Sequence, residues 1–260
     1  MSLTPKGNNI SLSKFESMLK TNSVYFFDSI EFEEIIHYYI DSGKISLAKK
    51  AIKLGLKQHP NSMILRLLEA ELLIFDGELV RASVLLRELQ AIEPTNEEIY
   101  VQQASIFSKN DEHLKAINSL KMALTYTDDE ADVLAMIGME YLYLNNFDQA
   151  RLNFSKCLDV DYEDYSSLYN VVYCFDMENK HTEAIVFLNK YIDKDPYSEV
   201  AWHQLGRQYF ILEQYEDAVR AFDYAVLIDE FFVGAYLEKA KSLEQLDQFE
   251  EAIKNYKATL

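Results

Sequence analysis

The stretch from Glu199 to Phe232, EVAWHQLGRQYFILEQYEDAVRAFDYAVLIDEFF, indicates how the rest of the chain folds. Apolar residues recur in it three and four positions apart, which predicts two amphipathic helices joined by a short polar turn. The two apolar stripes consist of Leu205, Tyr209 and Leu212, and of Ala218, Phe222 and Ala225. Because Gly206 and Ala218 are small, we expect the two helix axes to approach most closely at these residues.

The same pattern recurs every 34 residues along the chain. Steps of 34 from Ala218 reach six further alanines, which are Ala48, Ala82, Ala116, Ala150, Ala184 and Ala252. Four residues after each alanine comes a large side chain: Ile52, Leu86, Leu120, Phe154, Leu188, Phe222 or Tyr256. Nine residues before each alanine comes another, usually aromatic: Tyr39, Leu73, Phe107, Tyr141, Phe175, Tyr209 or Leu243. This register, without one insertion, predicts a tandem array of helix pairs.

A further column of residues lies between the two helices of each unit. Its members are Gly43, Gly77, Asp111, Asn145, Asn179, Glu213 and Asp247. Most are of types that tolerate a left-handed backbone, so we expect each to end the first helix of its unit. Pro60, Pro94 and Pro196 end the second helix of three units, because proline cannot continue a helix.

These columns resemble the tetratricopeptide repeat, in which W-x2-L-G-x2-Y in the first helix precedes A-x3-F in the second. The residues at these positions are Trp202, Leu205, Gly206, Tyr209, Ala218 and Phe222. The resemblance implies an all-α solenoid of antiparallel helix pairs wound into a right-handed superhelix. It predicts seven tandem units over residues 29–260: 29–62, 63–96, 97–130, 131–164, 165–198, 199–232 and the incomplete 233–260.

Residues 1–28 are predicted to form an N-terminal tail and a capping helix. A helix over Ser11–Lys20 would carry apolar residues on one side and cover the open end of the stack. Those residues are Leu12, Phe15, Met18 and Leu19. The link Val24–Phe27 is expected to pack under this cap, with an exposed aromatic docking motif as the alternative.

The C-terminal unit lacks a polar capping helix. We therefore expect the natural chain to continue past Leu260. We also expect the 260-residue chain to self-associate through the exposed end near Tyr256 and Leu260.

The charge of the chain excludes some classes of partner. With a formal net charge of −18, the surface repels phosphate backbones, which argues against nucleic-acid binding. Neither a signal peptide nor an apolar run long enough for membrane insertion is present. Cys157 and Cys174 are expected to be buried free thiols, typical of the cytoplasm, with a disulfide between them as the alternative.

Catalytic and cofactor-binding motifs are absent from the sequence. It contains no nucleophile elbow, P-loop, dinucleotide fingerprint or zinc-protease motif. The five histidines are scattered over five units, so a metal site is not expected. We therefore predict that the chain is not an enzyme and holds no cofactor.

The resemblance implies that the first helices line a concave groove that binds a peptide or a partner protein. Residues three and four apart on the first helices define this face. The candidate site residues are Val101, Met139, Tyr169, Asn170, Tyr173, His203, Gln204, Arg207 and Lys241. We expect a ligand whose aromatic or aliphatic anchor meets the tyrosines and whose acidic group meets Arg207. In the alternative, Arg207 and Lys241 only pair with Asp176, Glu238 or Glu244.

Three functions remain open from the sequence alone. The first is a non-catalytic scaffold or adaptor that binds a partner protein. The second is the recruitment or regulatory array of a larger enzyme or assembly that extends beyond residue 260. The third is a structural spacer or self-associating subunit.

Overall fold

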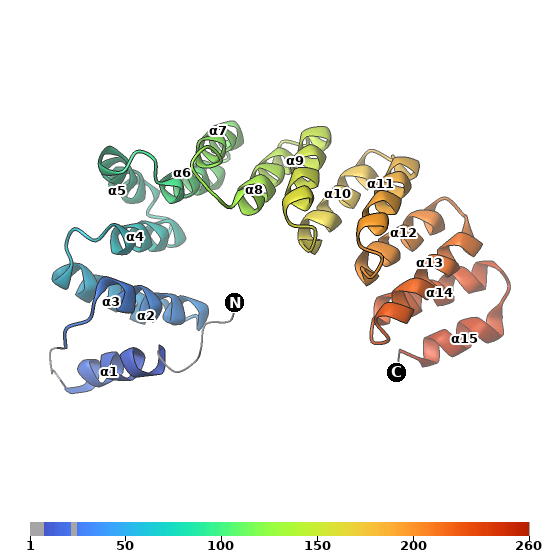
Figure 1. The fold of residues 1–260 in the computed structure, drawn as a ribbon, viewed down its shortest axis with the longest axis horizontal. Helices are drawn as coiled ribbons and strands as arrows, with labels where there is room; N and C mark the ends of the chain where they lie inside the picture. Colours follow the sequence, from blue (N-terminus) through green and yellow to red (C-terminus); the bar gives the residue numbers. More distant parts are fainter. Residues whose placement is uncertain (1–7, 22–24, 260) are drawn as a thin grey trace. The chain divides into compact units, whose positions relative to one another are not determined.

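The protein is built entirely from helices in the part of the chain that the structure describes. The structure is a computed structural model and describes residues 8–21 and 25–259. Within these ranges the chain forms fifteen helices and no strand (Figure 1). The prediction of an all-α fold of antiparallel helix pairs is therefore confirmed.

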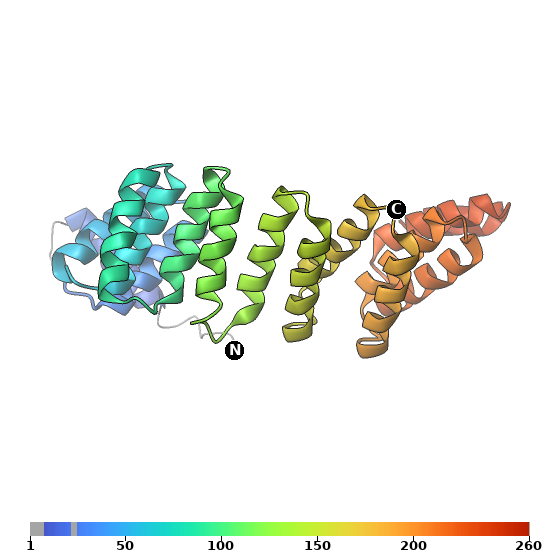
Figure 2. The same ribbon diagram turned by 90° about the horizontal axis from the view of Figure 1, so that it is seen from above.

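The chain divides into two compact units, Met1–Asp128 and Asp129–Leu260. The helices of the first unit are α1 (Asn8–Thr21), α2 (Ser29–Asp41), α3 (Ile45–Gln58), α4 (Met63–Phe75), α5 (Leu79–Ile92), α6 (Glu97–Lys109) and α7 (His113–Ala123). After α1 they form consecutive pairs whose members pack against each other, α2 on α3, α4 on α5 and α6 on α7. Figure 2 shows these pairs lying side by side, from blue to green.

The second unit repeats the same arrangement. Its helices are α8 (Glu130–Tyr143), α9 (Phe147–Val160), α10 (Tyr165–Met177), α11 (His181–Lys194), α12 (Glu199–Ile211), α13 (Tyr215–Ile228), α14 (Val233–Gln245) and α15 (Phe249–Lys257). First helices of successive pairs also contact each other, α10 on α12 and α12 on α14.

The turn inside each helix pair has a left-handed residue. Positive φ angles occur at Gly43, Gly77, Asp111, Asn145, Asn179, Glu213 and Asp247, with values from 53° to 78°. The predicted column of left-handed residues is thus confirmed at every position. One left-handed residue ends the first helix and lets the chain reverse within a few residues.

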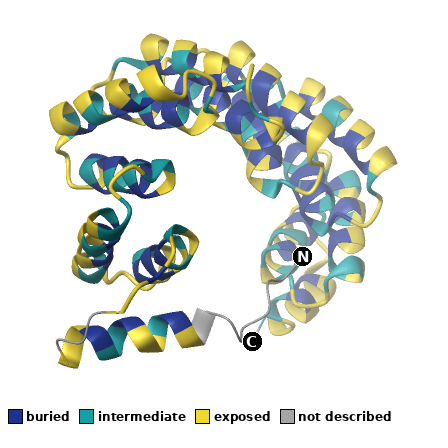
Figure 3. Cartoon of the chain, turned by 60° about the vertical axis from the view of Figure 1, so that its left-hand side comes forward, coloured by how far each residue is buried: buried dark blue, intermediate teal, exposed yellow. Residues whose placement is uncertain are grey.

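A small residue faces a large one where the two helices of a pair meet. The seven alanines of the repeated column are at most 1% exposed. An added Cβ at Gly206 would lie 2.6 Å from the ring of Phe222, and one at Gly138 would lie 2.7 Å from the ring of Phe154. Both rings are fully buried, so the helix backbones approach only because these positions lack a side chain. Figure 3 shows the buried sides of the helices facing one another and the exposed sides turned outward.

The N-terminal helix α1 packs on the first pair. Phe15 is fully buried among the rings of Phe27, Phe32 and Tyr39, with ring centroids 6.0–6.2 Å away. The Ser11 hydroxyl donates a 2.7 Å hydrogen bond to Glu31. The apolar side of α1 therefore lies against α2.

Some of the sequence predictions at the ends differ from the structure or lie outside it. Leu19, expected on the packed side of α1, is 38% exposed. Phe27 is buried, whereas Phe26 is 74% exposed, so the predicted packing of this link holds for only part of it. Val24 and Leu260 lie outside the described residues.

The close approach at Gly206 generates a stability prediction. Replacing Gly206 by Ala should destabilise the protein by about 1–3 kcal/mol, because the new methyl group overlaps a buried ring. This loss opposes the gain of about 1 kcal/mol that alanine normally brings to a helix interior. Urea unfolding followed by far-ultraviolet circular dichroism measures the difference.

Gly234→Ala is the matched control. A Cβ at Gly234 meets its nearest neighbour at 3.4 Å, an ordinary contact, so this variant should be as stable as the native chain or slightly more stable. Equal stability of the two variants would contradict a helix contact that depends on the absence of a side chain at Gly206.

Candidate functional site

Two exposed tyrosines lie one turn apart on α10. Tyr169 is 43% exposed and Tyr173 is 47% exposed. Between them on the buried side of the helix lie Val171 and Val172, which are at most 1% exposed and fix α10 in the core. Neither tyrosine makes a hydrogen bond or ring contact with another described residue. The rings are therefore held by a rigid helix and open to solvent.

The neighbouring candidate residues are only half-buried. The Asn170 amide lies 3.9 Å from the sulfur of Met139, which brings α10 and α8 together at this point. Val101 lies on α6, in the first unit, and is also half-buried. The structure therefore places Met139 and Asn170 in contact. Val101 belongs to the other unit of the chain.

The structure corrects the predicted exposure of His203 and Gln204. His203 is 9% exposed and its ring lies 4.8 Å from that of Phe232, while Gln204 is 1% exposed. The spacing of three and four residues places both on one face of α12, but both are buried there, His203 against Phe232 and Glu238. These two side chains therefore do not contribute to an exposed binding surface.

Arg207 and Lys241 line the same small cavity, which has a volume of about 180 Å³. Its other lining residues are Phe210, Ile211 and Glu238. Glu238 lies 3.7 Å from the Arg207 Nε, and its other oxygen lies 3.0 Å from the His203 Nε2. Arg207 also donates a 3.2 Å hydrogen bond to Gln204. Two cations and one carboxylate thus share the cavity.

The predicted pairing of this basic end with carboxylates holds in part. Arg207 has Glu238 as a partner, whereas Lys241 makes no ion pair with any described residue. Asp176 instead accepts a hydrogen bond from Gln208, and Glu244 accepts one from Tyr256. Lys241 therefore leaves the cavity with an excess positive charge.

Sequence reasoning missed a buried polar network behind this surface. Gln208 is fully buried, donates a 2.9 Å hydrogen bond to Asp176 and lies 3.0 Å from a ring nitrogen of His181. The network joins α10, α11 and α12. A signal was present, because the repeat column of Gln208 holds apolar residues such as Ile106 in other units. A polar residue in a buried column must find a partner inside the protein.

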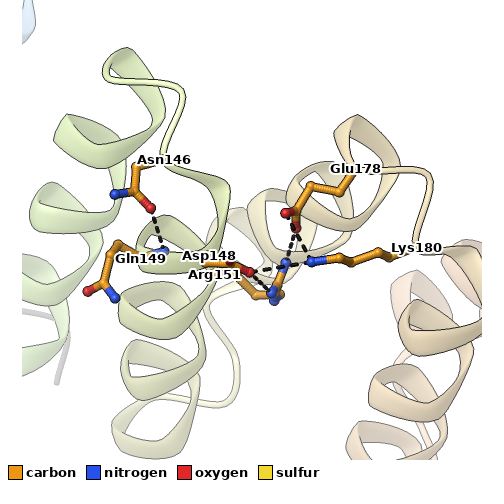
Figure 4. A network of polar contacts seen from close by, with 6 residues as sticks. All are labelled: Asn146, Asp148, Gln149, Arg151, Glu178 and Lys180. Atoms are coloured by element: carbon orange, nitrogen blue, oxygen red, sulfur yellow. Dashed lines mark hydrogen bonds and ion pairs between the residues drawn. The ribbon is translucent and has the colours of Figure 1, made fainter.

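A second polar network fixes α10 from the other side. Arg151 on α9 forms ion pairs with Asp148 and with Glu178, the latter at 2.5 Å (Figure 4). Lys180 approaches the same two carboxylates at 3.5 and 3.0 Å. The Arg151 guanidinium also lies 4.5 Å from the ring centre of Phe175 on α10. Hydrogen bonds from Arg151 hold the pKa values of Asp148 and Glu178 below their usual range.

The thiols are unsuited to nucleophilic chemistry. Cys157 and Cys174 are buried and not joined in a disulfide, as the sequence predicted. Burial raises the pKa of each thiol to about 11, so both are protonated at neutral pH. Over the described ranges, no group of three or more His, Cys, Asp or Glu side chains could hold a metal ion. None of the helices in these ranges is long and apolar enough to span a membrane.

Comparison with known families agrees with the repeat columns. Two family models described as tetratricopeptide repeat match residues 135–199 and 233–258. The chain therefore carries tetratricopeptide repeats over these residues. Proteins of this family are protein-interaction scaffolds and are typically non-catalytic.

Solved structures of this family share the fold. A tetratricopeptide repeat protein from Parabacteroides merdae ATCC 43184 has a TM-score of 0.51 at 19% identity, over 88% of this chain and 91% of its own. The APC/C hetero-tetramer Cut9–Hcn1 includes a chain with a TM-score of 0.53 at 16% identity, over 96% of this chain and 48% of its own.

A curated relative is similar over most of the chain. The DnaJ homolog subfamily C member 7 homolog of Schizosaccharomyces pombe is 22% identical over 193 residues. The match covers 74% of this chain and 37% of the relative.

The Arg151 network predicts how stability depends on pH. A lowered carboxyl pKa stabilises the folded state above the usual pKa, and this contribution is lost as pH falls through the lowered value. Glu178→Gln should therefore be less stable than the native chain at neutral pH, and the difference should shrink between about pH 5 and pH 3. Urea unfolding at a series of pH values measures it.

Glu230→Gln is the control for this prediction. Glu230 lies in the turn before α14 and makes no ion pair with any described residue. Its replacement should change stability little at any pH. If the loss of stability in Glu178→Gln stays constant across the pH range, the network does not act through ionised carboxylates.

Proposed function

We propose that the chain is a non-catalytic scaffold that binds an extended segment of a partner protein on one face of α10, α12 and α14. This is the face turned away from the second helices with which they pair. The observation that carries this proposal is the pairing of two kinds of surface on neighbouring helices. Exposed tyrosine rings lie on α10, and a cavity with excess positive charge lies between α12 and α14. The family of the chain supports a scaffold function.

The tyrosines are suited to an aromatic or aliphatic anchor of the ligand. Aromatic side chains offer a large contact area and lose little conformational entropy on binding. The backbone that carries Tyr169 and Tyr173 is already ordered in α10, which lowers the entropic cost of binding. Their hydroxyl groups can hydrogen-bond the backbone of an extended ligand.

The cavity is suited to an acidic group of the ligand. The guanidinium of Arg207 has five N–H donors, and its contact with Glu238 is longer than the 2.7–2.9 Å typical of a charge-assisted hydrogen bond. Donors of Arg207 are therefore available to a carboxylate, and Lys241 adds a second positive charge. Glu238 competes for the same donors, which favours ligands that place the carboxylate nearer Lys241. The net charge of −18 would repel such a ligand from most of the remaining surface.

The cytoplasm is the compartment that this proposal favours. Cys157 and Cys174 are free thiols in the structure, and free cysteines are typical of proteins kept in a reducing environment.

Selection from a displayed peptide library on the native chain tests the proposal. We expect enriched peptides to combine an aromatic or large aliphatic residue with an acidic one. Tyr173→Ala and Arg207→Ala should each weaken binding of a selected peptide by about tenfold, as anchors at the centre of an interface do. Their melting temperatures should change little, because exposed side chains and exposed ion pairs contribute little to stability.

Matched controls are available in the same unit. Tyr197 is 80% exposed in the loop before α12, and Arg220 lies on α13 with a 71% exposed side chain. Tyr197→Ala and Arg220→Ala should leave the affinity unchanged. If Tyr173→Ala and Arg207→Ala bind as well as these controls do, the face of α10, α12 and α14 is not the binding site.

A further inference from the structure

A stripe of lysines on α3 differs in charge from the rest of this acidic protein. The helix carries Lys49, Lys50, Lys53 and Lys57 and no acidic residue. The equivalent helix α13 carries one arginine and three acidic residues. The whole chain has 43 acidic residues and 25 lysines and arginines. The positive charge of α3 is therefore a local feature, which the predicted site on the first helices does not include.

Three of these lysines line a cavity of about 540 Å³ between α3, α4 and α5. Lys49, Lys53 and Lys57 are exposed and form one wall. The apolar lining includes Leu56 on α3 and Leu73 on α4, both half-buried and open to the cavity. The cavity thus joins a row of cations to an apolar surface.

Carboxylates at the rim satisfy some of the positive charges. Lys49 pairs with Asp76 at 2.5 Å, and Arg81 pairs with Glu78 at the same distance. Lys53 and Lys57 form no ion pair with any described residue. These two cations lie beside the apolar surface without an ion-pair partner among the described residues.

The spacing of the lysines matches an extended chain. Residues four apart on a helix are separated by about 6 Å along its axis. Alternate residues of an extended segment point to the same side and are separated by about 6.6 Å. An extended segment lying along α3 would therefore bring every second side chain to a lysine, and would turn the intervening side chains toward the opposite wall at Leu73.

We propose that this cavity docks an extended acidic segment of a partner protein, in which carboxylates alternate with aliphatic side chains. The carboxylates would pair with Lys53 and Lys57, and the aliphatic side chains would cover Leu56 and Leu73. This surface is separate from the face of α10, α12 and α14 and belongs to the other unit of the chain.

The shape and charge of the rim favour a single peptide chain over an anionic membrane. Glu69, Asp76 and Glu78 lie beside the lysines, so a flat anionic surface that reached Lys53 would also meet these carboxylates. A single segment can place its own carboxylates on the lysines and avoid the rim. The net charge of −18 also opposes attraction to anionic lipids over longer distances.

Fluorescence anisotropy with a labelled synthetic peptide tests the proposal. The probe is a peptide of three consecutive Glu-Leu pairs flanked by glycine and serine, used at low salt, where surface charges are weakly screened. The native chain should bind it. Lys53→Glu should weaken binding by about tenfold or more, since it replaces an attractive charge with a repulsive one.

Lys50→Glu is the matched control. Lys50 is exposed on the same helix, does not line the cavity and forms no ion pair with a described residue, and its replacement changes the net charge equally. This variant should keep the native affinity within about twofold, because the interaction of a more distant exposed charge is screened. The comparison is repeated in the Arg207→Ala background, which removes any contribution from the face of α10, α12 and α14, and Lys53→Glu should lose as much affinity there as in the native background.

Three results would overturn the proposal. The first is the absence of peptide binding to the native chain. The second is an equal loss of affinity in Lys53→Glu and Lys50→Glu, which would indicate the general field of α3 and not the cavity. The third is sedimentation of the native chain with phosphatidylserine vesicles that Lys53→Glu abolishes, which would assign the lysines to lipid headgroups.

Discussion

The packing of a large side chain against a small residue, as the Phe222 ring packs against Gly206, is the constraint on which the helix pairs depend. Pairs without a glycine on the first helix, such as α2 and α3, still carry a buried alanine of the repeated column on the second helix, here Ala48. Large side chains can fill the space between the helices only if the residues facing them are small. The left-handed turn residue then brings the second helix back onto the first. Each pair is completed by its neighbours, as in other repeat proteins.

This construction separates the residues that hold the fold from those that can bind a partner. The repeated columns at which the two helices of a pair meet are buried. The exposed faces of the helices take no part in that contact. On α10 the buried Val172 and the exposed Tyr173 are consecutive residues. The networks around Gln208 and Arg151 hold α10 against its neighbours from two sides. A binding surface on such a helix is rigid before the ligand arrives, which lowers the entropic cost of binding.

The sequence predicted the helix pairs because their determinants are local and repeated. The alanine columns and the turn residues recur at a fixed spacing, so each unit supports the interpretation of the others. Exposure was harder to predict. His203 and Gln204 have the spacing of an exposed face but are buried. His203 lies against Phe232 and Glu238, contacts that the spacing within one helix does not predict. The pairing of Arg207 with Glu238 likewise depends on how α14 packs on α12.

The lysine stripe was visible in the sequence and still escaped functional interpretation. The resemblance to the family predicts a binding groove on the first helices, whereas Lys53 lies on a second helix. Only the structure shows that Lys53 and Leu73 line one cavity. A helix whose charge differs from that of the rest of the chain can be found from the sequence. The apolar residues of other helices that lie beside it cannot.

The partner is proposed to bind the face of α10, α12 and α14 that is turned away from their paired second helices. Hydrogen exchange with and without a selected peptide tests it most directly, because it reports on every helix at once. Slower exchange is expected in α10, α12 and α14 when the peptide is bound, with α9, α11 and α13 unchanged. Protection confined to α9, α11 and α13 would contradict it.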